Sequence, residues 1–134
     1  MIKKYTCQNG ARIVLENIPT VRSVAIGLWI KTGSVNETES NNGISHFLEH
    51  MFFKGTETRN AKEIAEAFDS IGGQVNAFTS KEYTCYYAKV LDTHASYALN
   101  VLGDMFFHSV FDGTELEKEK NVVYEEIKMY EDTP

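Results

Sequence analysis

Residues 114–131 predict a helix that carries two acids in the middle of its apolar face. At about 100° per residue, Glu119 and Glu126 lie only about 20° apart on the helical wheel. The apolar side chains on either side of them are Leu116, Val122, Val123, Ile127, Met129 and Tyr130. An unpaired carboxylate in such surroundings costs several kcal/mol, so both acids require a cation or a hydrogen-bonded partner when this face packs. The alternative is that the helix register is misjudged.

A second segment supplies side chains that can hold such a cation. In the helix predicted for residues 42–54, His46 and His50 lie about 40° apart, one turn above the other, which is the spacing at which two imidazoles bind one metal ion. Glu49 lies about 60° to the other side of His46, and apolar residues fill the opposite arc. Two His and one Glu also recur by chance on solvated helices, so the two acids of the C-terminal helix give this motif its weight.

Together the two segments predict a catalytic zinc site with three protein ligands. His46, His50 and Glu126 supply two imidazoles and a carboxylate, and the sequence offers no fourth ligand for a closed structural site. Water takes the open position, where zinc lowers its pKa to about 7. Glu49 is placed to accept the proton as general base, because it shares the ligand helix but points to the flank of the imidazole pair. Glu119 is expected to orient a ligand His or the water.

The remaining segments predict an α+β domain in which helices cover a mostly antiparallel sheet. Strands are expected at residues 2–8, 11–16, 21–31, 74–79 and 83–90, with the first two joined at Asn9-Gly10. The strand at 21–31 has apolar residues on both faces and is expected to be central. Two further helices are expected, one at 61–71 after the Asn60 cap, and one after Asp92 or Thr93 that buries Ala95, Ala98, Leu99, Leu102, Met105 and Phe106.

Composition argues against several partners. The 134 residues suit one domain, and 13 Lys and Arg against 19 Asp and Glu give a net charge of −6, which opposes attraction to nucleic acid or anionic lipid. The longest apolar stretch, residues 24–30, is far shorter than the about 20 residues of a membrane span. The N-terminus lacks the apolar core of a secretory signal, and the two cysteines form no CxxC pair. A reducing compartment is expected, either the cytoplasm or, after removal of a transit peptide, the mitochondrial matrix.

The stretch from His46 to His50 reads H-x-x-E-H, which is the inverzincin signature. With its surroundings, the chain resembles the pitrilysin or insulinase-like family of zinc peptidases, and within it the processing-peptidase branch that includes the mitochondrial processing peptidase and its bacterial relatives. The stretches that carry the resemblance are residues 43–56, 72–80, 84–89 and 119–129. The likeness therefore runs almost end to end.

This resemblance implies a metalloendopeptidase that uses Zn²⁺ to hydrolyse extended or presequence-like peptides. It assigns the zinc to His46, His50 and Glu126, proton transfer to Glu49 and a supporting role to Glu119. It also implies that residues 74–79 form an edge strand beside the zinc, to which an extended peptide adds by backbone pairing. The substrate-binding residues implied in this way are Asn76, Ala77, Phe78 and Thr79.

The resemblance further implies that residues 1–134 are the N-terminal part of the first, zinc-binding catalytic domain. It implies that the remainder of that domain and a second half of the protein are absent from this chain. A second homologous half, or another copy of the chain, is the expected protein partner. Two alternatives stay open, namely a non-catalytic zinc-binding or assembly subunit of the same fold, and an inactive fragment. The intact set of His46, Glu49, His50 and Glu126 favours the peptidase.

Overall fold

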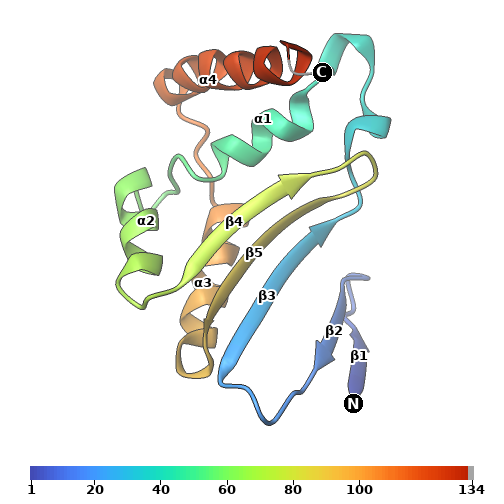
Figure 1. Cartoon of the computed structure of the whole chain (residues 1–134), viewed down its shortest axis with the longest axis vertical. Coiled ribbons are helices and arrows are strands. Elements are labelled where there is room, and N and C mark those ends of the chain that lie inside the picture. The colour runs from blue at the N-terminus through green and yellow to red at the C-terminus, as the bar shows by residue number, and fades with distance from the viewer. Residues whose placement is uncertain (133–134) are drawn as a thin grey trace.

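The computed structural model describes residues 1–132, apart from the side chains at 127 and 130–132. It has the predicted α+β architecture (Figure 1). The strands are β1 (Ile2–Thr6), β2 (Arg12–Glu16), β3 (Ser23–Ile30), β4 (Gln74–Thr79) and β5 (Thr84–Leu91). The helices are α1 (Ile44–Met51), α2 (Ala61–Asp69), α3 (Ala95–Phe107) and α4 (Gly113–Asp132), with short 3-10 turns at Ser34–Asn36, Glu39–Asn41 and Asp92–His94. Each predicted element is present, with ends that differ by a few residues.

The main sheet has three antiparallel strands in the order β3-β5-β4. Ser23 pairs with Leu91 and Ile30 with Thr84 on one side of β5, and Gln74 pairs with Lys89 on the other. The prediction that β3 is central is therefore wrong for the described residues, where β5 is central. Only one face of β3 is covered, and Trp29 on the other face is 64% exposed.

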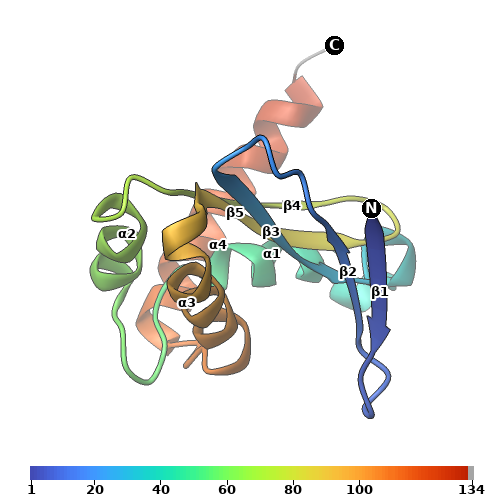
Figure 2. The ribbon, with the colours of Figure 1, turned by 90° about the horizontal axis from the view of Figure 1, so that it is seen from below.

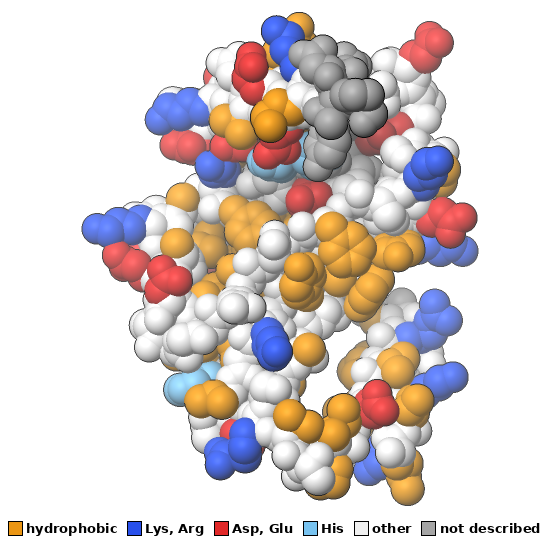
Figure 3. All heavy atoms as spheres, in the orientation of Figure 1, with side chains coloured by type: hydrophobic (Ala, Val, Ile, Leu, Met, Phe, Trp, Pro, Cys, Tyr) orange, Lys and Arg blue, Asp and Glu red, His pale blue; other side chains and the backbone are white. Residues whose placement is uncertain are grey.

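Trp29, on the second face of β3, belongs to a surface cluster of aromatic side chains. Trp29 packs against Phe78 of β4 and against Tyr83, with ring centroids 5.9 and 5.2 Å apart. Figure 3 views this face of the sheet, where apolar side chains gather over the strands. Apolar residues on both faces of β3 therefore did not mean burial on both sides: the outer face carries Trp29, which packs laterally against neighbouring rings, and no second layer covers it within residues 1–132.

The N-terminal hairpin forms a separate sheet. β1 pairs with β2 from Ile2↔Glu16 to Thr6↔Arg12, and the chain turns at Asn9-Gly10 as predicted. Gly10 has φ +88°, a left-handed conformation that favours glycine. All residues of both strands are exposed, and Figures 1 and 2 place the hairpin next to β3 and away from the helices. The main core therefore depends on the other three strands.

The core lies between the main sheet and helices α2 and α3, which cover one face of the sheet (Figure 2). Its buried residues are Ile64, Ala67, Phe68, Tyr86, Ala88, Val90, Ala98, Val101, Leu102 and Met105. The prediction that Leu99 is buried is wrong, since this side chain is 51% exposed. The inward face of α3 follows positions 98, 101, 102 and 105, so Val101 takes the buried place that was expected for Leu99.

Helices α1 and α4 lie together at the edge of this core. Helix α1 contacts β4 on one side and α4 on the other, as Figure 1 shows. Residues 52–54 continue from α1 as a turn, so the helix is shorter than the predicted 42–54. None of the helices described in residues 1–132 has the length and apolar composition needed to cross a membrane. The contact of α1 with α4 brings the two motifs of the sequence face to face.

Candidate metal centre

The first turn of α1 is held by an acid from the preceding loop. Glu37 accepts hydrogen bonds from the backbone amides of Gly43, at 3.2 Å, and Ser45, at 2.8 Å. Amides at a helix N-terminus lack helical partners, so a carboxylate there stabilises the start of the helix. Gly43, at φ +88°, allows the chain to turn into the helix at this point. The orientation of α1, and of the histidines on it, is therefore anchored at its beginning.

Three potential ligand atoms converge between α1 and α4. The Nε2 atoms of His46 and His50 lie 3.2 Å apart, and Glu126 Oε2 lies 3.2 Å from the first and 3.4 Å from the second. Within the described residues, these three side chains form the one cluster whose ligand atoms all lie within 4.8 Å of one another. Two imidazole nitrogens and a carboxylate oxygen that face one point are a donor set suited to a zinc ion. The residues present therefore fit the metal that the sequence predicts.

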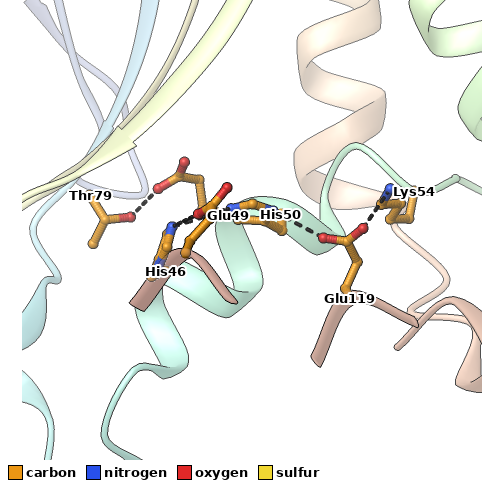
Figure 4. A network of polar contacts seen from close by, with 7 residues as sticks. His46, Glu49, His50, Lys54, Thr79 and Glu119 are labelled. Atoms are coloured by element: carbon orange, nitrogen blue, oxygen red, sulfur yellow. Dashed lines mark hydrogen bonds and ion pairs between the residues drawn. The ribbon is translucent and has the colours of Figure 1, made fainter. Parts of the chain in front are cut away.

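Glu119 lies behind His50, on the same face of α4 as Glu126. Its Oε2 lies 3.0 Å from His50 Nδ1, and its Oε1 lies 2.7 Å from Lys54 Nζ (Figure 4). An ionised carboxylate only accepts hydrogen bonds, so the proton of the first contact is on Nδ1, and Nε2 lies on the side of His46 and Glu126. The predicted orienting role of Glu119 thus has a specific partner in the structure, namely His50.

The charge of Glu119 is set by opposing effects. Glu119 is 5% exposed, and burial by itself raises the pKa of this carboxyl. The hydrogen bond and the charge of Lys54, together with those of His50, outweigh burial, so the pKa of Glu119 lies below its ordinary value. Glu119 is therefore ionised at neutral pH, as an acceptor of two hydrogen bonds requires.

Glu49 lies on the other flank of the imidazole pair. Its Oε2 accepts a hydrogen bond from Thr79 Oγ1 of β4 at 2.5 Å, as Figure 4 shows. Burial raises the pKa of the Tyr86 phenol, and the negative charge of Glu49 raises it further. Glu49 is not part of the cluster of potential metal ligands. It lies beside the two histidines, at the position predicted for the general base.

The two histidines, Glu49 and Glu126 line an open groove of about 1240 Å³, and strand β4 forms one wall of it. Among the described residues β4 has one neighbour, β5, so its other edge is free, as expected for a strand that accepts a peptide.

The four residues predicted to bind substrate divide between the two faces of β4. Thr79 contacts Glu49 on the α1 side, and Ala77 shares that face by alternation. Asn76 and Phe78 lie on the opposite face, where Phe78 packs against Trp29. Asn76 Oδ1 also accepts a hydrogen bond from the Ala77 amide at 2.8 Å. All four residues line the groove, but only two of their side chains point toward the metal centre.

This arrangement can be compared with known proteins. The model of the family described as insulinase (peptidase family M16) matches residues 12–134. The chain belongs to this family. It is 81% identical over 134 residues to a Bacillus subtilis protein named "uncharacterized zinc protease YmxG", a match that covers all of this chain and 33% of that protein. It is 47% identical over 133 residues to a Streptomyces coelicolor protein also named a zinc protease, with 99% of this chain and 29% of that protein covered.

A solved structure agrees with this assignment. The crystal structure of a protease from Helicobacter pylori superposes on this insulinase-family chain with a TM-score of 0.90 and 28% sequence identity. The match covers 94% of this chain and 30% of the Helicobacter pylori chain. The chain spans about a third of the length of the curated relatives that it matches. Membership of the insulinase family, inferred from the sequence by resemblance, is therefore confirmed.

Two residues of this insulinase-family site were missed by the sequence analysis. Lys54 binds Glu119, and its spacing of four residues from His50 was a usable signal, because both side chains can reach one acid on a facing helix. Glu37 holds the start of α1, but it lies in a polar loop in which nothing in the sequence distinguishes it from Glu39.

Proposed function

We propose that this chain supplies the metal ligands and the general base of a zinc-dependent endopeptidase. The observation that carries the proposal is the convergence of His46, His50 and Glu126 from two packed helices, with Glu49 beside them in one groove. Family membership and the names of the relatives support zinc as the metal and a peptide bond as the bond that is cleaved.

Each side chain has a distinct task in the proposed reaction. His46, His50 and Glu126 hold the zinc ion, and Glu119 fixes His50 with Nε2 toward it. A bound zinc ion supplies Lewis acidity, which brings the pKa of water at the open position to about 7. Glu49 takes the proton from the attacking water, whose oxygen bonds to the peptide carbonyl carbon. The C–N bond then breaks, and Glu49 returns the proton to the leaving amine. Thr79 donates to Oε2 of Glu49, and Oε1 is proposed as the oxygen that accepts the proton.

The proposed substrate is an extended, presequence-like peptide that lies along the free edge of β4. Backbone pairing gives such binding its affinity, and alternate side chains enter pockets on the two faces of the strand. Ala77 is small and allows a peptide to approach the metal centre closely. The Ala77 amide already has Asn76 Oδ1 as its partner, so a peptide that pairs here replaces that contact or joins it.

We also propose that residues 1–134 form the N-terminal part of a larger catalytic unit. The share of the relatives' length that is covered supports this assignment. The aromatic cluster around Trp29 and the free edge of β3 are surfaces that a further part of the protein, a second homologous half or another copy of the chain would cover.

Peptide turnover by the full chain, measured before chelation, after chelation and after zinc is restored, tests the function. The proposal predicts that turnover disappears with the chelator and returns with zinc. Stoichiometric zinc binding without turnover of any extended peptide would support the alternatives, a non-catalytic zinc-binding or assembly subunit of the same fold or an inactive fragment.

A further inference from the structure

We infer that Lys54 is a positioning residue of the metal centre, which acts through Glu119 to hold His50 in the orientation that presents Nε2 to the metal. The inference rests on the proposed zinc site and adds a residue that the sequence analysis did not assign. Its basis is a continuous chain of contacts, in which Lys54 Nζ lies 2.7 Å from Glu119 Oε1 and His50 Nδ1 lies 3.0 Å from Glu119 Oε2 (Figure 4).

The backbone after α1 places Lys54 for this contact. The amide of Phe53 donates to the carbonyl of His50 at 3.2 Å, and that of Lys54 donates to the carbonyl of Met51 at 3.1 Å. The chain therefore keeps turning in the helical direction beyond the end of α1. His50 and Lys54 are four residues apart, so their side chains leave α1 and its turn on the same side. One carboxylate from α4 bridges the two.

Both oxygens of Glu119 depend on these two donors. The Glu119 side chain is 6% exposed, so water has little access to an oxygen that loses its protein partner. A buried carboxylate with one oxygen unsatisfied rotates or shifts toward another donor. Because His50 is bound to the other oxygen, a shift of Glu119 moves or releases the imidazole as well. Lys54 thus fixes Glu119 in the position that His50 requires.

A purely structural role for Lys54, as a link between α1 and α4, makes different predictions. Such a role would show itself in the free energy of unfolding and would not depend on the ring of one histidine. The positioning role predicts a change in zinc affinity and in the protonated nitrogen of His50, with recovery when the donor is restored. The test therefore needs a readout at His50 and a conservative variant.

The test compares Lys54→Met, Lys54→Arg and Lys118→Met with the wild type in the full chain. Lys118 is the matched control, because it lies next to Glu119 in sequence but is exposed and pairs with Glu115. Zinc affinity is measured by competition with a chelating dye. The tautomer of His50 is measured by ¹⁵N NMR of the ring nitrogens, and folding by circular dichroism.

We expect Lys54→Met to lower zinc affinity about tenfold, at the lower end of the range for groups that orient metal ligands, with Lys54→Arg close to wild type. We also expect His50 of the wild type to carry its proton on Nδ1 and to lose this preference in Lys54→Met. Equal affinities for Lys54→Met and Lys118→Met, or equal loss in Lys54→Met and Lys54→Arg, would overturn the inference.

If Lys54→Met does not fold, the wild-type NMR spectrum still decides, because a proton on Nε2 of His50 contradicts the inference. A wild-type protein that binds no zinc overturns the proposed function and this inference together. If the wild-type protein binds zinc and Lys54→Met binds it with the same affinity, this inference alone is overturned.

Discussion

Thr79 of the edge strand donates a hydrogen bond to Glu49 of the ligand helix. This contact joins the proposed general base to the strand along which the substrate is proposed to lie. It occupies one oxygen of the carboxylate and leaves the other for water. This hydrogen bond therefore links the position of the base to the strand on which the peptide is proposed to lie.

Thr79→Val tests this contact, because valine keeps the shape of threonine and removes the donor. We expect kcat to fall by about 10- to 150-fold, which corresponds to the roughly 1.5–3 kcal/mol contributed by a hydrogen bond to a charged group. Zinc affinity should stay unchanged, since Thr79 touches no ligand. Thr79→Ser keeps the hydroxyl and should retain most of the activity. Equal activities of the Val and Ser variants would show that the hydroxyl does not position Glu49.

Glu49→Gln separates proton transfer from metal binding. The variant should bind zinc as the wild type does, because Glu49 is outside the ligand cluster, and its turnover should fall by about 10²–10⁴-fold. Zinc content by atomic absorption and peptide cleavage are measured on the same sample. Glu66→Gln, on the exposed side of α2, is the control and should remain active. An active Glu49→Gln enzyme would exclude Glu49 as the base.

Two adjacent acids on α4 test the register of that helix. Glu126→Gln removes a proposed ligand and should weaken zinc binding by more than about 100-fold, which exceeds the usual effect of losing a group that only orients a ligand. Glu125→Gln changes an exposed neighbour and should leave the affinity nearly unchanged. Dye competition measures both variants. Equal affinities would mean that the face of α4 directed at α1 is assigned wrongly.

Stability should depend on pH through Asp104 of α3. This carboxylate accepts hydrogen bonds from Thr56 Oγ1 at 2.7 Å and from Arg59 at 2.8 Å, and so fixes the loop after α1 against α3. Burial raises the pKa of Asp104, but these hydrogen bonds and the charge of Arg59 outweigh it, so the pKa lies below its ordinary value. A group with a lowered pKa stabilises the fold above its unfolded-state pKa, and this contribution is lost as the pH falls through the folded-state pKa.

Asp104→Asn should therefore lower the free energy of unfolding by about 1–3 kcal/mol at pH 7. The difference from wild type should shrink below about pH 4, where Asp carboxyls become protonated. Urea unfolding followed by circular dichroism at both pH values measures it, with the exposed Asp69→Asn as the control. If the free energies of unfolding of wild type and Asp104→Asn differ by the same amount at pH 7 and below about pH 4, the assigned charge of Asp104 is contradicted.

The candidate site was largely predictable because its residues break the rules that govern the rest of the sequence. Glu119 and Glu126 are acids on an apolar helical face, so the pattern of that helix alone required a partner for them. His46 and His50 met the ligand spacing on another helix. In the structure the two helices pack together and bring these four side chains into contact.

The residues that the sequence did not reveal depend on distant contacts. Lys54 and Glu37 are ordinary charged residues outside the helices and strands, and their importance appears only when α4 and the first turn of α1 lie beside them. The position of β3 also depends on distant contacts. Apolar residues on both faces of a strand indicate burial only if other elements cover both faces, and in β3 one face is left open. Trp29 is covered on its side by neighbouring aromatic rings instead.

Anomalous diffraction at the zinc absorption edge, from crystals of the zinc-loaded full chain, tests the proposed metal centre most directly. We predict one strong peak between α1 and α4, bonded to Nε2 of His46, Nε2 of His50 and a carboxylate oxygen of Glu126, at about 2.0–2.2 Å from each. Glu119 should remain on His50 Nδ1 and outside the coordination shell. No peak at this position, or a peak coordinated by Glu119 in place of Glu126, would contradict the proposed site.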